Sequence, residues 1–392
     1  MQLTKKARAL ILMTAAMGCT AFVASASNAS PITGGDLVVY QVGTRSAALT
    51  SASTAAFVDE YTTSGTPVQQ IALPTAASGS NFPLTNSGTA TSEGELTVSP
   101  NGQYVTVAGY DAAPGVSGIA GTSATNNPRV VGIIPVSTGV PDTSTTLGSS
   151  AFSGNNPRSA ITTNGTSIWA GGAGGTEATQ GGVWYTTDGS STSTLLVGGN
   201  QRQVGVYNGQ LYIGAGSATA PAVIGVSAVG SGLPTTTGQT TSVIPGVDTG
   251  SSGSPYAYVM ESLGGTNNPD TIYVEDNTAG IEKYSLVGST WTLTGTVALP
   301  PSGTNGPSGL AALVVGSVVD LYATTPSAIY NLDDASGFDG TLAGTPTNIA
   351  SAPTNTAFRG IGVIPAVPEP ASISLLCLGG LGLLNRRRAM NA

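Results

Sequence analysis

Five charged residues stand at the beginnings of apolar segments, where they could act together. Arg158, Arg202 and Arg359 each lie at or next to the start of such a segment, and Glu93 and Glu95 precede another. Guanidinium groups bind carboxylates and other planar anions through paired hydrogen bonds. If the segments are strands around one axis, these side chains form a mixed-charge channel rim for an anionic or polyhydroxylated ligand. The alternative is that they join neighbouring repeats, and their equivalent positions favour this alternative.

The remaining polar residues give no pattern of a catalytic or metal site. The sequence has no histidine, which excludes histidine-based triads and most catalytic zinc sites. Acidic pairs occur at 59–60, 275–276 and 333–334, but neighbours on a strand point to opposite faces. We therefore expect no enzyme activity, no cofactor and no metal. The alternative is a carboxylate-dependent extracellular enzyme acting on polysaccharides, a lyase or glycosidase, which needs two carboxylates within about 5–10 Å in a pocket.

The composition favours strands joined by tight turns. Only 8% of the 392 residues are charged, whereas 40% are hydrophobic and 55 are glycine. A helical protein would need many more Lys, Glu and Arg on its exposed faces, because a typical soluble domain is about a quarter charged. The hydrophobic content also argues against a disordered chain.

Pairs of apolar, aromatic-rich segments recur through the middle of the chain. The clearest copies contain the Asn-Gly pairs 101–102, 164–165 and 208–209, for which we predict hairpin turns with positive φ at both residues. These copies are Gly94–Asp111, Arg158–Gly172 and Arg202–Gly216. Weaker copies are Tyr256–Ser262 with Thr271–Asp276, and Gly309–Thr325, which turns at Gly316-Ser317. Further strand-like pairs are Gly280–Leu286 with Trp291–Pro300, and Ala55–Gly65 with Pro67–Pro74.

The spacing of these units predicts an all-β fold, a β-propeller. Units begin near residues 95, 159, 203, 256 and 309, close to the ~40–50 residues of a propeller blade. Gly35–Gly43 lacks an inner partner and Phe358–Ala366 lacks a hairpin mate, so their pairing would close the ring without a free edge. We predict six four-stranded blades, with seven as the alternative. A β-solenoid and a pair of β-sandwiches are the competing folds.

The charges and cysteines divide the chain into a body and two ends. Six of the twelve Lys and Arg lie in the ends, so residues 30–366, called the body below, keep six basic against nineteen acidic residues. Such a body repels nucleic acid and anionic membrane surfaces. Cys19 and Cys377 also lie in the ends, which leaves the body without a disulfide.

Residues 1–29 have the order of a secretory signal peptide. Lys5, Lys6 and Arg8 precede an apolar run from Ala9 to Ala24, and cleavage after Ala26 or Ala29 fits the small-x-small rule. A lipoprotein signal at Cys19 is an alternative, although the Leu that such signals favour is missing.

Residues 367–392 combine a Pro-Glu-Pro motif, a short apolar run and a basic end. The motif is Pro368, Glu369 and Pro370, the run lies within a predicted transmembrane segment 371–385, and Arg386, Arg387 and Arg388 follow. The apolar run from Ile373 to Leu384 has twelve residues, which falls short of the ~20 of a full span. The three arginines stay cytoplasmic by the positive-inside rule, which places the body outside.

This tail resembles the PEP-CTERM sorting signal of Gram-negative bacteria. The resemblance implies recognition by an exosortase and removal of the tail near Pro368–Pro370, after signal peptidase has acted at the other end. It also implies an inner-membrane intermediate, followed by delivery to the cell surface or extracellular matrix. An ordinary C-terminal anchor is the alternative. We expect a non-enzymatic body that binds glycans or proteins. We also expect the protein to touch the membrane only through its tail, before processing, and not to bind nucleic acid. A body that carries O-linked sugars is a further possibility.

Overall fold

The computed structural model describes residues 30–216, 224–247, 253–300 and 309–366. Within these ranges every element is a β-strand except one 3-10 turn, η1 (Ile119–Gly121). The described residues contain no helix with the length and apolar character of a membrane span. Both predicted sorting segments, 1–29 and 367–392, and with them segment 371–385, lie outside the described residues.

Four separate sheets have four antiparallel strands each, in meander order. The first contains β9 (Pro157–Thr162), β10 (Ser167–Gly172), β11 (Gly182–Thr187) and β12 (Thr194–Val197). The second contains β13 (Val204–Tyr207), β14 (Gln210–Ala215), β15 (Gly225–Val229) and β16 (Thr241–Val243). The third contains β17 (Pro255–Glu261), β18 (Thr271–Asp276), β19 (Gly280–Val287) and β20 (Thr290–Val297). The fourth contains β21 (Leu310–Val315), β22 (Val318–Thr325), β23 (Ala328–Asp334) and β24 (Thr347–Ser351).

The other strands form a single nine-stranded sheet. They are β1 (Leu37–Val42), β2 (Ser53–Tyr61), β3 (Pro67–Ala72), β4 (Thr85–Ser87), β5 (Thr97–Val98), β6 (Tyr104–Tyr110), β7 (Arg129–Pro135), β8 (Asp142–Thr146) and β25 (Ala357–Val363). Two meanders, β25-β1-β2-β3 and β5-β6-β7-β8, are joined by β4, which pairs with both β2 and β6. The predicted count of six or seven separate blades is therefore wrong. Four four-stranded sheets stand alone, because β4 joins the remaining strands into one sheet.

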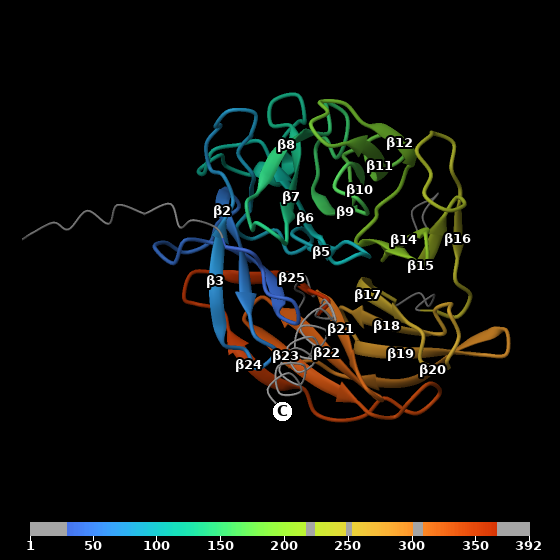
Figure 1. Ribbon diagram of the computed structural model, residues 1–392. Coiled ribbons are helices and arrows are strands. Elements are labelled where there is room, and N and C mark those ends of the chain that lie inside the picture. Colours follow the sequence, from blue (N-terminus) through green and yellow to red (C-terminus); the bar gives the residue numbers. More distant parts are fainter. Residues whose placement is uncertain (1–29, 217–223, 248–252, 301–308, 367–392) are drawn as a thin grey trace, which may run out of the picture.

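The sheets are arranged around a common centre in a propeller-like manner (Figure 1). The inner strands β25, β5, β9 and β13 contact one another in that order, and β17 contacts β21, which contacts β25. Strands β14 and β15 contact β17. The predicted pairing of the first and last strands is confirmed, since β1 and β25 run antiparallel with Leu37 opposite Val363 and Val42 opposite Ala357.

The hairpin turns agree only in part with the Asn-Gly prediction. Asn208 and Gly209 both have positive φ, 47° and 74°, and form the expected two-residue turn between β13 and β14. At 101–102 and 164–165 only the glycine has positive φ. There the asparagine Oδ1 accepts hydrogen bonds from backbone amides two or three residues on. This Asx arrangement turns the chain without left-handed asparagine, so the prediction for these two asparagines is wrong.

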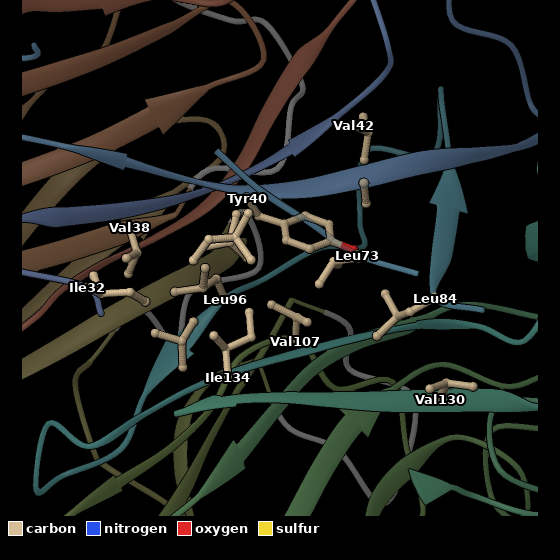
Figure 2. Close-up of a cluster of buried hydrophobic side chains, with 14 of the residues drawn as sticks. Ile32, Val38, Tyr40, Val42, Leu73, Leu84, Leu96, Val107, Val130 and Ile134 are labelled. Carbon is tan, nitrogen blue, oxygen red and sulfur yellow. The ribbon is translucent and has the colours of Figure 1, made fainter. Parts of the chain in front are cut away.

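The core lies between neighbouring sheets, and β1 shows how. Successive side chains of a strand point to opposite sides, and both sides of β1 are buried. Val38, Tyr40 and Val42 pack with residues of β6 and β7 (Figure 2). Leu37 and Val39 pack against the sheet of β21–β24 instead. A strand covered on both sides is mostly apolar, and in β1 only the buried Gln41 departs from this, which explains the nearly unbroken apolar segments of the sequence.

Candidate functional site: the two ends of the inner strands

Arg158 and Ser159 of β9 reach across to the next sheet. Nη1 of Arg158 donates to Oδ1 of Asn200 at 2.5 Å and to the carbonyl of Gln201 at 3.1 Å. Oγ of Ser159 donates to the carbonyl of Arg202 at 2.6 Å and accepts from the amide of Val204 at 2.9 Å. Both residues therefore hold β9 to the segment that enters β13. Burial, followed by the neighbouring charge of Arg202, lowers the pKa of Arg158 to about 10.

Arg202 repeats this contact one sheet further on. Its Nη1 donates to Oγ of Ser254 at 3.0 Å and to the carbonyls of Ser254 and Pro255 at 2.9 and 3.1 Å. Its guanidinium lies 3.8 Å from the centre of the Tyr256 ring, a cation–π contact. The side chain thus joins the start of β13 to the start of β17.

Arg359 and Glu93 lie where the two meanders of the nine-stranded sheet meet. Arg359 donates from Nη2 to the carbonyl of Gly88 at 3.1 Å. Glu93 accepts from the amide of Ser87 at 2.5 Å and from Oη of Tyr110 at 2.7 Å. Burial raises the pKa of Glu93 to about 7, although the Tyr110 hydrogen bond and the charge of Arg359 act in the opposite direction.

Glu95, just before β5, differs from the other four residues because its carboxylate has no hydrogen-bond partner. It is 1% exposed, and both carboxylate oxygens are unpaired. Burial raises its pKa to about 8, against the charges of Arg202, Arg158 and Arg359. The structure thus places Glu95 within electrostatic reach of all three arginines. The role of these residues as a ligand-binding rim stays a prediction, whereas the hydrogen bonds described above are contacts within the protein.

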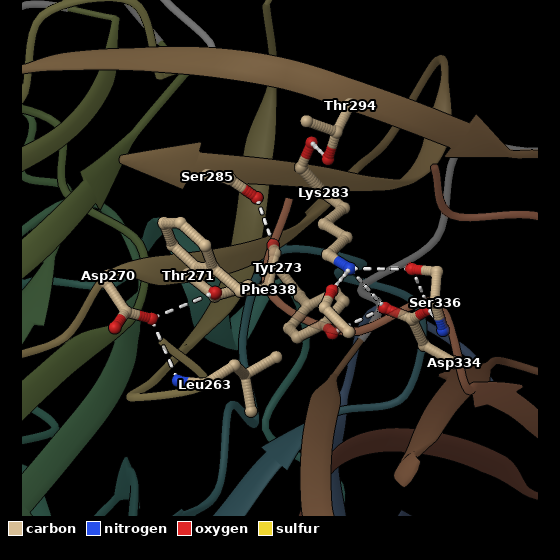
Figure 3. Close-up of polar contacts among 11 residues, drawn as sticks. Leu263, Asp270, Thr271, Tyr273, Lys283, Ser285, Thr294, Asp334, Ser336 and Phe338 are labelled. Atoms are coloured by element: carbon tan, nitrogen blue, oxygen red, sulfur yellow. Dashed lines mark hydrogen bonds and ion pairs between the residues drawn. The ribbon is translucent and has the colours of Figure 1, made fainter. Parts of the chain in front are cut away.

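Sequence reasoning missed a buried ion pair between two other sheets. Nζ of Lys283 on β19 lies 2.8 Å from Oδ2 of Asp334 on β23, and both side chains are at most 2% exposed (Figure 3). Asp334 also accepts from Oη of Tyr273 at 2.6 Å and from Oγ of Ser336 at 2.5 Å. Burial alone would raise the pKa of Asp334, but these hydrogen bonds and that from Lys283 lower it. The one signal in the sequence was that Lys283 is the sole lysine of the body.

The opposite ends of the inner strands surround a cavity of about 350 Å³. Residues from β5, β9, β13, β17, β21 and β25 line it, so only the folded ring creates it. Glu261, the last residue of β17, is the carboxylate on its wall. Burial raises the pKa of Glu261 to about 7. No sequence pattern marked this residue.

A second cavity, of about 510 Å³, lies beside β2 and β3. Asp59 and Glu60 both line it, but they have different partners, as expected for neighbours on a strand. Asp59 accepts from Nε2 of Gln70 at 2.8 Å, and Glu60 accepts from Nε2 of Gln69 at 2.6 Å. Across the described ranges, no three His, Cys, Asp or Glu side chains gather in a way that could hold a metal ion.

Comparison with known proteins identifies the C-terminal segment. Residues 366–388 match the PEP-CTERM protein-sorting motif. The chain carries a PEP-CTERM sorting motif. The motif implies an exported protein that passes through a membrane-anchored intermediate and is processed by an exosortase. It begins at residue 366, directly after β25 and the short segment that follows it.

No curated protein matches this chain. Among solved structures, a nidogen/laminin complex chain is similar with 13% identity and a TM-score of 0.46, covering 85% of this chain and 99% of that one. AztD of Citrobacter koseri is similar with 10% identity and a TM-score of 0.37, covering 83% and 97%. A protein of unknown function from Bacteroides thetaiotaomicron has 10% identity and a TM-score of 0.39, covering 85% and 76%. At these scores, no property of those proteins is transferred to this chain.

Proposed function

We propose that this protein is a non-enzymatic component of the cell surface or extracellular matrix of a Gram-negative bacterium, with a propeller-like body that binds a ligand. The observation that carries the proposal is the sorting motif at residues 366–388. The signal-peptide pattern of residues 1–29 agrees with it, because both ends then direct the same body out of the cytoplasm.

The contacts of the basic residues in the body support a structural role for them. Arg158, Arg202 and Lys283 each join one sheet to the next. Arg129 donates to the carbonyls of Asn127, Thr122 and Asn155. Contacts of this kind hold a ring together.

The sorting part of the proposal is tested by fractionation and intact-mass measurement of the native protein. We expect a mass that matches a chain beginning after Ala26 or Ala29 and ending near Pro368, recovered from the surface or matrix fraction. A variant with Arg386, Arg387 and Arg388 changed to Gln should accumulate with its tail uncut, because the basic stop is lost. Recovery of the unchanged protein in the inner membrane with the full tail would overturn the proposal.

The non-enzymatic part needs a separate test. We expect the purified protein to leave polysaccharides from the same matrix at their original chain length, measured by size-exclusion chromatography after prolonged incubation. A fall in chain length that stops when Glu261 or Asp59 is changed to the amide would show carboxylate-dependent cleavage instead.

A further inference from the structure

Glu261 occupies an unusual position for a charged residue of this protein. It is half-buried at the end of β17 and lines the 350 Å³ cavity together with Val259, two residues earlier on the same side of the strand. Val98 of β5, Val206 of β13 and Ala312 of β21 supply apolar parts of the wall. Thr97, Ser99 and Gln203 supply polar parts, and the cavity is open to solvent. The Glu261 carboxylate therefore lies beside aliphatic side chains in a cavity that a ligand can enter from solvent.

No basic residue of the protein body neutralises this carboxylate. The body has six Lys and Arg, and all six lie within the described residues. Lys283 pairs with Asp334, and Arg45 lines the second cavity. The other four basic residues donate hydrogen bonds to other groups of the protein, as described above; they are Arg129, Arg158, Arg202 and Arg359. Within the described residues, the Glu261 carboxylate also accepts no hydrogen bond.

The titratable groups that face Glu261 are acids rather than bases. Tyr207 of β13 and Tyr273 of β18 lie close enough for the carboxylate to raise the pKa of each, although burial is the larger cause for both. For Tyr273 the hydrogen bond to Asp334 and the charge of Asp334 also raise the pKa more than Glu261 does. Burial raises the pKa of Glu261 itself to about 7. An ionised carboxylate that is partly withdrawn from water without a partner is less stable than one in bulk water, so a bound cation would reduce the cost of ionising it.

We propose that this cavity binds a small organic cation, with its primary ammonium group hydrogen-bonded to the carboxylate of Glu261 and its short apolar portion against the aliphatic wall. A volume of about 350 Å³ lies at the lower end of small-molecule sites, which favours a short ligand. The body has nineteen acidic against six basic residues, and this excess draws cations toward it. The inference rests on the proposed binding role and names its ligand class.

The test uses protein produced from the full-length coding sequence and n-butylammonium as the probe, with 1-butanol as the uncharged match. Calorimetry at pH 8 should show saturable binding of the ammonium ion, and binding of the alcohol at least about tenfold weaker. At pH 6 the affinity should fall roughly ninefold, because a carboxyl with a pKa of about 7 is about 90% ionised at pH 8 and about 10% at pH 6. The ammonium stays charged at both values.

Three variants separate the site from general effects. Glu261→Gln should weaken binding at pH 8 at least about tenfold and remove its pH dependence, while the thermal transition shows a folded protein. Ala312→Leu narrows the cavity and should also weaken binding, although Glu261 is unchanged. Glu282→Gln is the matched control, because Glu282 is another half-buried glutamate but lies outside the cavity and accepts from Oη of Tyr284. This control should bind like the unchanged protein.

Three results would overturn the inference: no saturable binding at pH 8, equal binding of butanol and butylammonium, or unchanged affinity in folded Glu261→Gln. None of them bears on sorting, because Glu261→Gln should reach the same cell fraction with the same intact mass. A protein that is sorted correctly but binds no ammonium refutes this inference and leaves the proposed surface location in place.

Discussion

The buried pair between Lys283 and Asp334 allows a quantitative test of how the sheets are held together. Replacing Asp334 with Asn removes the negative charge but leaves Lys283 buried, with only neutral acceptors, which are Oγ of Ser336, the carbonyl of Gly337 and the amide oxygen at position 334. Breaking a buried ion pair in this way costs about 3–5 kcal/mol. Unfolding entropy is about 2.1 cal/mol/K per residue, or roughly 0.7 kcal/mol/K over the body. The expected fall in Tm is therefore about 4–7 °C.

The assay is thermal unfolding followed by circular dichroism at pH 7 and pH 3. The hydrogen-bonded Asp334 has a lowered pKa, so its contribution is present above the unfolded pKa near 4 and is lost as pH falls through the folded pKa. The defect of Asp334→Asn should therefore shrink at pH 3. The double variant with Lys283→Met should lose less stability than the sum of the two single variants, by about 1–3 kcal/mol. A fall in Tm below about 2 °C, or strict additivity, would refute the assignment of this pair as an inter-sheet link.

Three further variants address the end of the inner strands at which Arg158, Arg202 and Arg359 lie. Glu95→Gln should raise the urea midpoint at pH 9 but not at pH 4. Burial raises the pKa of Glu95 to about 8, so its ionised form opposes folding increasingly as the pH rises above the unfolded pKa near 4.3. An equal effect at both pH values would contradict this. Ser159→Ala should cost about 1–3 kcal/mol in urea unfolding, since two buried backbone groups lose their partner; a change within 0.5 kcal/mol, the usual range for surface positions, would argue against the contact. Arg202→Gln should lower Tm without changing butylammonium affinity, and a selective loss of an anionic or glycan ligand would instead support the predicted channel rim.

Much of the strand order could be predicted because it is encoded locally. The pair Asn208–Gly209 has the conformational preference that a two-residue turn requires, and β13 and β14 flank it as expected. The segments predicted at Gly35–Gly43 and Phe358–Ala366 contain β1 and β25, and they pair because each otherwise leaves an open edge. The short strand β4 escaped prediction, since three residues, Thr85–Ser87, have neither alternation nor turn signals at a useful length.

The polar sites were less accessible to sequence reasoning because they depend on contacts between distant residues. Arg158 and Arg202 were identified by their equivalent positions, but their actual partners are carbonyls and an asparagine of the next sheet. Lys283 and Asp334 are 51 positions apart and meet only when β19 and β23 pack together. Glu261 has no distinguishing neighbours in sequence, and its significance comes from a cavity that six strands enclose.

The pairing of β1 with β25 has a mechanical consequence for the membrane-anchored intermediate, which is held through its C-terminal end. Gly35 donates to the carbonyl of Ile364 and Ile364 donates to that of Asp36, so the ladder continues to the end of the described chain. A pull between residue 366 and a point on the far side of the ring acts along β25 and loads the rungs of this ladder in shear, all at once. A pull between residue 366 and the N-terminal end of the body acts on adjacent ends of two antiparallel strands and opens the rungs one by one. The ring therefore resists load best when only its C-terminal end is tethered.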